Sequence, residues 1–132
     1  MAQCSERQHA GSASPLEAEI GFSRAVRVGN HGYVSGTAPL DEKGKTYAPG
    51  NLEAQTRRCF EIAVRALNDL GMRKQDAVRT RIMLTDITRW QEAAKVHGEF
   101  FHDVRPACTF VQVSRFIDPE WLVEIEVDAI AT

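Results

Sequence analysis

The feature that most constrains the fold is an alternating run close to the C-terminus of this 132-residue chain, residues 121–131. Apolar residues take every second position of the run, and carboxylates take the positions between them. The apolar set is Val123, Ile125, Val127 and Ala129, and the carboxylates are Glu124, Glu126 and Asp128. Because successive side chains of a strand point to opposite faces, the run predicts a strand with one buried face and one acidic face.

The acidic face has two interpretations. Three carboxylates in a row repel one another unless cations lie opposite them. Residues 76–86 alternate as a second strand, which places Arg79 and Arg81 together on one face. One interpretation is therefore ion pairing between the two strands on a solvated face. The other is that Glu124, at the start of its strand, lines a cleft.

Two further stretches have the periodicity of amphipathic helices. Residues 51–70 begin at Asn51, a favourable N-cap, and are followed by Gly71, a typical helix stop. Residues 88–91 read T-R-W-Q and match a capping box. The helix that they open must end before Pro106, because the residue preceding a proline disfavours the helical conformation.

Alternating runs at residues 24–36, where a Gly/Asn-rich turn separates two strands, and at residues 108–116 complete the pattern. The element order is strand, strand, helix, strand, helix, strand, strand. This order predicts an α+β fold with one mixed sheet and two helices packed on one face. The other face would stay open, and apolar strand residues such as Val111 and Phe116 favour oligomerisation.

Composition narrows the function classes. Hydrophobic residues make up 43% of the chain, charged residues 26%, and the formal net charge is −2, so neither nucleic acid nor a membrane surface is indicated as a partner. No run approaches the ~18 apolar residues of a transmembrane helix. Residues 1–15 are small and polar and lack the apolar region of a signal peptide. We predict a flexible tail over residues 1–15, a single domain over residues 16–132 and a cytoplasmic location.

The cysteines and histidines predict no metal site. Cys4, Cys59 and Cys108 are an odd number with no C-x-x-C spacing, which argues against a disulfide framework and a structural zinc site. Cys59 lies on the apolar stripe of the first helix and is interpreted as packing. His97 lies on the stripe of the second helix and is interpreted as a core histidine.

Several motifs in this order resemble one family. The segments are "RAVRVGNHGYVSGTAPLDEKG", "NLEAQTRRCFE", "VRTRIMLTDITRW" and "VEIEVDAIA". Together they are similar to the RidA/YjgF family, also called endoribonuclease L-PSP, over residues 19–131. The resemblance implies a chorismate-mutase-like α+β fold and a homotrimer with a small-molecule cleft at each subunit interface. It also implies hydrolysis of reactive enamines and imines, such as 2-aminoacrylate, without a metal or organic cofactor.

The chain departs from the family at one informative position. Active members carry a P-A-R-S motif whose arginine grips the substrate carboxylate, whereas this chain has Cys108 in that place. A guanidinium binds a carboxylate through two parallel hydrogen bonds. Losing such a desolvated contact costs about 2–5 kcal/mol, or about two to three orders of magnitude in binding. Standard 2-imino acid deamination is therefore disfavoured.

The other pocket positions of the family divide into changed and retained ones. Phe22 stands where the family has a pocket tyrosine, and Ala94 falls at about the place of an asparagine. Ser35, Gly36 and Glu124 are retained, and the resemblance implies that this glutamate positions or activates the attacking water. We therefore take Glu124 and Ser35 as candidate catalytic residues, and Phe22 and Gly36 as candidate substrate-binding residues.

Arg24 and Cys108 complete the predicted substrate-binding set. Arg24 stands two residues after Phe22, so it projects to the same side of a strand and is a candidate replacement for the missing arginine; the alternative is a surface charge. Cys108 is interpreted as a passive wall of the pocket. As a nucleophile it would need a neighbouring cation, and Arg105, three residues away on an extended segment, points in the opposite direction.

Three functions remain open from the sequence. The first is a 2-imino acid deaminase rescued by Arg24. The second, which the substitutions favour, is a related hydrolase for a small imine, enamine or carbonyl compound that has no carboxylate at the clamp position. The third is a non-catalytic trimer that binds a ligand or protects other proteins. RNA cleavage is not supported, because no basic patch with interleaved aromatics is visible.

Overall fold

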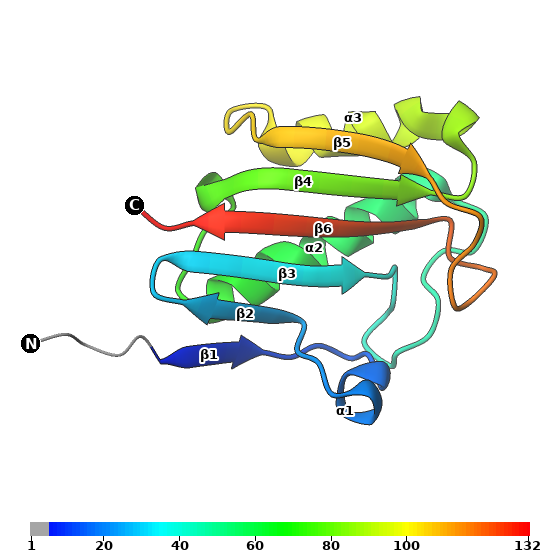
Figure 1. The fold of residues 1–132 in the computed structure, drawn as a ribbon. Coiled ribbons are helices and arrows are strands. Elements are labelled where there is room, and N and C mark those ends of the chain that lie inside the picture. Colours follow the sequence, from blue (N-terminus) through cyan, green and yellow to red (C-terminus); the bar gives the residue numbers. More distant parts are fainter. Residues whose placement is uncertain (1–5) are drawn as a thin grey trace, which may run out of the picture.

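The computed structural model describes residues 6–132, and a six-stranded mixed sheet forms its centre (Figure 1). The strands are β1 (Arg7–Ala10), β2 (Ala25–Val28), β3 (His31–Thr37), β4 (Ala77–Leu84), β5 (Ala107–Gln112) and β6 (Val123–Ile130). Their order across the sheet is β1-β2-β3-β6-β4-β5. β4 and β5 are parallel, and the other neighbouring pairs are antiparallel. The predicted α+β fold with a mixed sheet is confirmed.

Two long helices, α2 (Leu52–Asp69) and α3 (Trp90–Phe101), lie behind the sheet in Figure 1 and cover the same face. A third, short helix, α1 (Leu16–Ile20), lies beside one end of β2 and β3. Single turns of 3-10 helix at Lys74–Asp76 and Ile87–Arg89 lead into β4 and α3. Within residues 6–132, no helix is long and apolar enough to cross a membrane.

The predicted signals at the ends of α2 are confirmed. The side chain of Asn51 accepts a hydrogen bond from the backbone N–H of Ala54 at 3.0 Å. Gly71 takes the left-handed conformation with φ 73°, which a residue without a Cβ adopts without strain. The predicted capping box of the second helix is wrong. The carboxylate of Asp86 accepts from the N–H of Thr88, so a 3-10 turn precedes α3.

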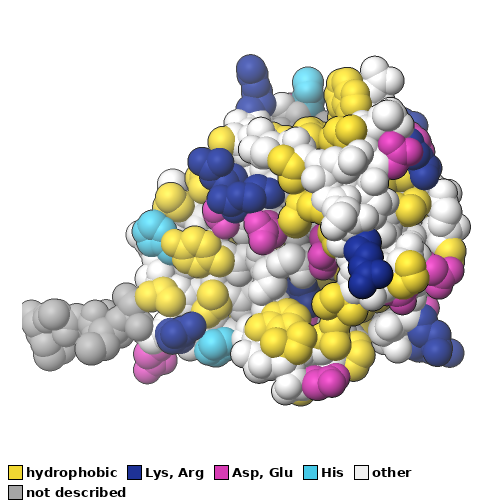
Figure 2. Space-filling model, turned by 45° about the vertical axis from the view of Figure 1, so that its right-hand side comes forward, with side chains coloured by type: hydrophobic (Ala, Val, Ile, Leu, Met, Phe, Trp, Pro, Cys, Tyr) yellow, Lys and Arg dark blue, Asp and Glu magenta, His cyan; other side chains and the backbone are white. Residues whose placement is uncertain are grey.

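The core lies between the two helices and the sheet. Its largest fully buried side chains come from both layers, among them Phe60, Leu67, Ile82, Leu84 and Ile125. The opposite face of the sheet, here called the open face, carries the alternate residues of the same strands. In Figure 2 it shows hydrophobic side chains next to basic and acidic ones.

The N-terminal segment is not the flexible tail that we predicted, as far as the structure describes it. Residues 7–10 form β1, which pairs with β2 from Arg7↔Val28 to Ala10↔Ala25, and α1 follows. An edge strand is held by backbone hydrogen bonds, so polar residues can form one without hydrophobic alternation. Residues 1–5, which include Cys4, lie outside the described part, and the prediction for them stays open.

Two strand predictions also need correction. The register of β4 shifts between Ala77 and Arg79, so Val78 is 42% exposed although strict alternation placed it with the buried residues. A bulge adds one residue to a strand and so reverses the alternation on one side of it. The strand predicted over residues 108–116 ends at Gln112.

Candidate functional site

The candidate site lies on the open face, where β3 ends and β6 begins. The register between these strands shifts between Val34 and Thr37, so Ser35 and Gly36 together oppose a single residue of β6. Both Val34 and Thr37 stay buried on the helix side. Bulges re-aim the backbone and are frequent beside functional sites, and this one brings Gly36 against the first carboxylate of β6.

Glu124 is the distinctive ionisable group of this site. A Cβ built on Gly36 would lie 3.7 Å from Glu124 Oε1, so the space above Gly36 adjoins the carboxylate. Burial raises the pKa of Glu124 above its ordinary value; the positive charge of Arg24 opposes this rise, and Glu126 adds to it. Among the hydrogen bonds and ion pairs of residues 6–132, none involves this carboxylate, and its neighbour in β4 is the uncharged Met83.

The other two carboxylates of the acidic face have a different environment. Arg81 of β4 lies 3.5 Å from Glu126 and 3.3 Å from Asp128. The two interpretations of the acidic strand face therefore apply to different residues. Glu126 and Asp128 form cross-strand ion pairs, whereas Glu124 has no such partner among the described residues.

Arg24 is not a surface charge. Arg24 is only 3% exposed, and its Nε lies 3.2 Å from the carboxylate of Glu17 in α1. The guanidinium carbon is 5.3 Å from the centre of the Phe22 ring, within the range of a cation–π contact. Nε and Nη1 already have protein partners, so Arg24 has few free donors left for a substrate. Its use as a substrate clamp stays a prediction.

Both the hydroxyl and the backbone carbonyl of Ser35 are hydrogen-bonded to neighbouring residues. Its hydroxyl donates to the backbone carbonyl of Ser23 at 2.7 Å, and its backbone carbonyl accepts from the Thr37 hydroxyl at 2.7 Å. While the first bond stands, Ser35 Oγ meets a ligand only as a hydrogen-bond acceptor. The structure thus brings Phe22, Ser35 and Glu124 to one end of the sheet with the other two candidates, Arg24 and Gly36.

Cys108 is the one predicted site residue that does not lie with the others in this chain. It is exposed, and it pairs in β5 with Thr80 of β4, a residue buried under the helices. Laterally paired residues of neighbouring strands point to the same face. Cys108 therefore points to the helix side, while Glu124 points to the open face. One chain does not place the thiol beside this carboxylate.

A separate cleft of about 490 Å³ lies on the helix side of Arg24. It runs between α2, residues 11–14 and residues 38–42, and Arg24 and Thr37 line part of it. Neither Glu124 nor Ser35 belongs to its lining. Its wall mixes basic and acidic side chains from α2 and the loops, so its size alone does not make it the reactive centre.

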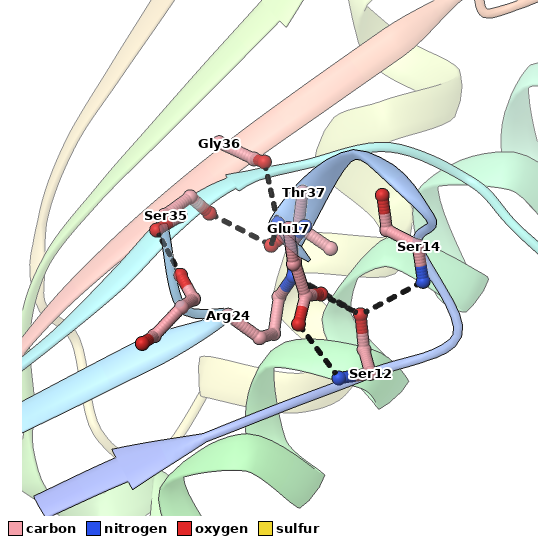
Figure 3. Close-up of polar contacts among 8 residues, drawn as sticks. Ser12, Ser14, Glu17, Arg24, Ser35, Gly36 and Thr37 are labelled. Carbon is pink, nitrogen blue, oxygen red and sulfur yellow. Dashed lines mark hydrogen bonds and ion pairs between the residues drawn. The ribbon is translucent and has the colours of Figure 1, made fainter. Parts of the chain in front are cut away.

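The site also uses Ser12, which the sequence interpretation assigned to the tail, and Glu17, to which it gave no role. Ser12 and Glu17 reach Arg24 from the segment before β2 (Figure 3). A signal for this was available, because Pro15 followed by an acidic residue in the next turn is typical of a helix start. The length of the helix, five residues, hid it from a search for amphipathic periodicity.

The interpretations of Cys59 and His97 are confirmed. Cys59 is fully buried in the core, and burial raises the pKa of its thiol well above the ordinary value. His97 Nε2 lies 2.8 Å from the hydroxyl of Thr80, and its ring packs against Phe60 and Phe101. In the described part of the chain, no cluster of three or more His, Cys, Asp or Glu side chains has the arrangement of a metal site.

Comparison with known proteins gives consistent matches over nearly the whole chain. The profile of the endoribonuclease L-PSP family matches residues 12–131. SCO2049 of Streptomyces coelicolor is 37% identical over 119 residues, 89% of this chain and 87% of that protein. The 3-aminoacrylate deaminase RutC of Acinetobacter baylyi is 35% identical over 101 residues, 76% of this chain and 79% of that protein. The crystal structure of Rv2704 from Mycobacterium tuberculosis, a member of the YjgF/YER057c/UK114 family, matches with a TM-score of 0.86 and 39% identity over 96% of this chain and 100% of that one.

Proposed function

This chain belongs to the endoribonuclease L-PSP family, which is also known as the YjgF or RidA family, and from that premise we propose that it hydrolyses a small enamine or imine to a carbonyl compound and ammonia. The observation that carries the proposal is Glu124, a carboxylate with a raised pKa and no ion-pair partner among the described residues, beside the open space over Gly36. A relative that is 35% identical is named a 3-aminoacrylate deaminase, and 3-aminoacrylate is an enamine.

The chemistry requires one group that moves a proton. The enamine first takes up a proton at carbon and loses one from nitrogen, which gives the imine. Glu124 accepts a proton from water while the water oxygen bonds to the imine carbon, and the electron pair of the C=N bond moves to nitrogen. Protonation of that nitrogen, loss of the hydroxyl proton and cleavage of the C–N bond then release ammonia and leave the carbonyl group. A carboxyl group with a pKa raised toward the working pH suits both the donation and the acceptance of a proton.

The proposed substrate lacks a carboxylate where 2-imino acids carry theirs. Cys108 replaces the cation of the family motif, and a thiol offers only a weak hydrogen-bond donor. In 3-aminoacrylate the carboxylate lies one carbon further from the amino-bearing carbon than in 2-aminoacrylate. A substrate of that kind, or one without a carboxylate, is compatible with the altered position.

We further propose that the cleft is completed by a second copy of the chain in a homotrimer. The open face carries four apolar side chains that are 38–46% exposed: Val28, Tyr33, Val111 and Ile130. Because Cys108 and Glu124 point to opposite faces of one sheet, a shared pocket needs Cys108 from a neighbouring subunit. Analytical ultracentrifugation should give about three times the chain mass of 14.7 kDa. A cytoplasmic location stays a prediction.

The decisive experiment measures ammonia release from a panel of substrates generated in situ: 3-aminoacrylate, 2-aminoacrylate and an enamine without a carboxylate. We expect turnover of at least one compound other than 2-aminoacrylate, and its loss in Glu124→Gln. The matched control is Glu126→Gln, which removes the next carboxylate of the same strand face, one that is ion-paired with Arg81. Equal activity of the wild type and Glu124→Gln would contradict the proposed role of this residue.

Cys108→Arg tests the substrate preference. Restoring the arginine should raise turnover of 2-aminoacrylate by about two orders of magnitude or more, while the preferred substrate gains little. No gain with 2-aminoacrylate would show that the position does not contact the substrate. If the panel compounds bind in a thermal-shift assay and no ammonia appears, the protein is a non-catalytic ligand-binding member of the family.

A further inference from the structure

Arg24 connects the N-terminal segment of the chain to the strand end beside Glu124. It stands directly before β2, and its backbone N–H donates to the carbonyl of Ala10 at the end of β1. Its guanidinium is among the few charged groups that the structure buries almost completely. A buried cation needs several hydrogen bonds and a counter-charge, and the partners of this one come from both sides of the site.

On one side the guanidinium binds the segment that contains α1. Nε donates to the carboxylate of Glu17 at 3.2 Å and lies 3.3 Å from the hydroxyl of Ser12. Ser12 also donates through its backbone N–H and its hydroxyl to the Glu17 carboxylate. Figure 3 shows these groups converging on Arg24. The counter-charge is therefore held in place by its own hydrogen bonds.

On the other side the same guanidinium binds the end of β3. Nη1 donates to the backbone carbonyl of Gly36 at 2.6 Å and to the hydroxyl of Thr37 at 3.2 Å. Thr37 in turn donates to the carbonyl of Ser35. These bonds fix the bulged residues of β3, and Gly36 is the residue that faces the Glu124 carboxylate.

We propose that Arg24 is a positioning residue for Glu124: it holds the Gly36 backbone beside the carboxylate and supplies a positive charge that acts on it, while Glu17 holds Arg24. The inference deepens the proposed function and rests on it for its catalytic meaning. It differs from a substrate clamp, because the guanidinium acts on the protein's own backbone and on the ionisation of Glu124.

The other charged and titratable groups around Glu124 are few. Besides Arg24, Glu126 on the same strand acts on Glu124, and Glu124 acts on the Cys59 thiol of α2. Arg81 on β4 pairs with Glu126, Glu17 on α1 pairs with Arg24, and Arg58 on α2 acts on Cys59. Arg81 is occupied by Glu126 and Asp128, and the Cys59 thiol is neutral because burial raises its pKa. Arg24 is the cation that opposes the rise in the pKa of Glu124.

The test follows the titration of Glu124 by NMR in protein labelled with 13C at the glutamate carboxyls, with the signal assigned by its loss in Glu124→Gln. In Arg24→Gln the midpoint should move to higher pH, because burial and Glu126 then act without an opposing charge. In Glu17→Gln it should move to lower pH, because one negative charge is removed and the Arg24 cation is kept. Loss of packing alone does not produce two shifts of opposite sign.

Arg27→Gln is the matched control. Arg27 also holds backbone, since it donates to the carbonyls of Gly29 and Leu70 at 2.8 Å, but these partners belong neither to the end of β3 that Arg24 binds nor to the segment of Glu17. Its substitution should leave the midpoint of Glu124 unchanged. An unchanged midpoint in both Arg24→Gln and Glu17→Gln would overturn the inference. If Arg24→Gln does not fold, the downward shift in Glu17→Gln decides alone.

Arg24→Lys separates charge from geometry. A lysine keeps the positive charge but cannot bind Glu17, Gly36 and Thr37 with one planar fork. The midpoint of Glu124 should stay near that of the wild type, while the amide resonance of Gly36 shifts. An amide resonance of Gly36 that stays at its wild-type position in Arg24→Lys would contradict the positioning role. The titration needs no turnover, so a failure of the proposed function (no ammonia released) and a failure of this inference (no opposite shifts) are distinguishable.

Discussion

The two ends of β6 present carboxylates on the same face and give them different chemistry. Glu126 lies opposite Arg81 and Asp128 opposite Arg79, and Arg81 forms ion pairs with both carboxylates, whose side chains with that of Arg81 are 27–41% exposed. Glu124 lies opposite Met83, beside the bulge of β3, with a raised pKa caused by burial. The alternating sequence makes the three positions equivalent, and the neighbouring strands make them different.

The difference shows that the ionisation of a carboxylate in this sheet depends on its burial and on the charges around it. At the paired end, the partly exposed Arg81 offsets the negative charge of both carboxylates. Such exposed ion pairs contribute little to stability. At the Glu124 end, the cation that acts on the carboxylate is Arg24, which is itself bound by Glu17 and by backbone. Glu124 is therefore left partly desolvated and able to exchange a proton.

The largest effect expected is on turnover. Glu124→Gln should lower the rate of ammonia release by about 10²–10⁴-fold, the usual contribution of a general acid or base. Glu126→Gln should leave the rate within about threefold of the wild type, because its carboxylate serves the ion pair with Arg81. Rates of ammonia release at saturating substrate check this, and equal losses in both variants would remove the distinction between the two ends.

The next effect is on stability and compares the two arginines. The side chains of Arg24 and Glu17 are 4% and 12% exposed, so Arg24→Gln leaves a carboxylate buried without its cation and should lower the free energy of unfolding by about 3–5 kcal/mol. Adding Glu17→Gln should recover part of that loss. Urea unfolding of the single and double variants measures it, and strictly additive losses would contradict the coupling.

A smaller effect concerns the pH dependence of stability. Because the pKa of Glu124 is raised in the folded state, the unfolded chain ionises first as the pH rises above the ordinary glutamate pKa. Stability then falls until the pH passes the raised value. Glu124→Gln removes this loss, so the variant should gain stability over the wild type at about pH 7 and little at about pH 4.

Urea unfolding at the two pH values measures this difference. Glu126→Gln controls for the removal of one negative charge from the same face. A gain for Glu124→Gln that is equally large at low and neutral pH would mean that the carboxylate is not destabilised by its burial.

The smallest effect is expected at the paired end. Arg81→Gln should lower the free energy of unfolding by less than about 1 kcal/mol, because its partners are partly exposed. Added salt should shrink the difference further. Arg79→Gln is the control, since Arg79 is exposed on the same strand. A loss from Arg81→Gln as large as that from Arg24→Gln would overturn the comparison between surface and buried pairs.

Much of the fold was predictable because its signals are local. Asn51 and Gly71 mark the ends of α2 through hydrogen bonding and backbone conformation that each residue carries with it. The buried face of β6 follows from strict alternation. In contrast, β1 and α1 were missed, because a polar edge strand and a five-residue helix leave no periodic pattern.

The sequence predicted which residues form most of the candidate site, but not how they are arranged in space. Phe22, Ser35, Gly36 and Glu124 came from the family resemblance, and the structure gathers them at one end of the sheet. The sequence could not show that Cys108 points to the other face, because this depends on the register of β5 against β4. Nor could it show that Arg24 is bound by Glu17 of the short helix α1 and by Ser12 of the presumed tail.

By itself, the sequence determined the α+β architecture, the acidic face of β6 and the loss of the family arginine at Cys108, because these depend on residue type and on spacing along the chain. Only the tertiary structure decided which carboxylate is ion-paired and which is desolvated. The surroundings of Glu124 come from Gly36, Met83 and Arg24, which lie far from it in the sequence. The pKa of a group depends on its neighbours in space.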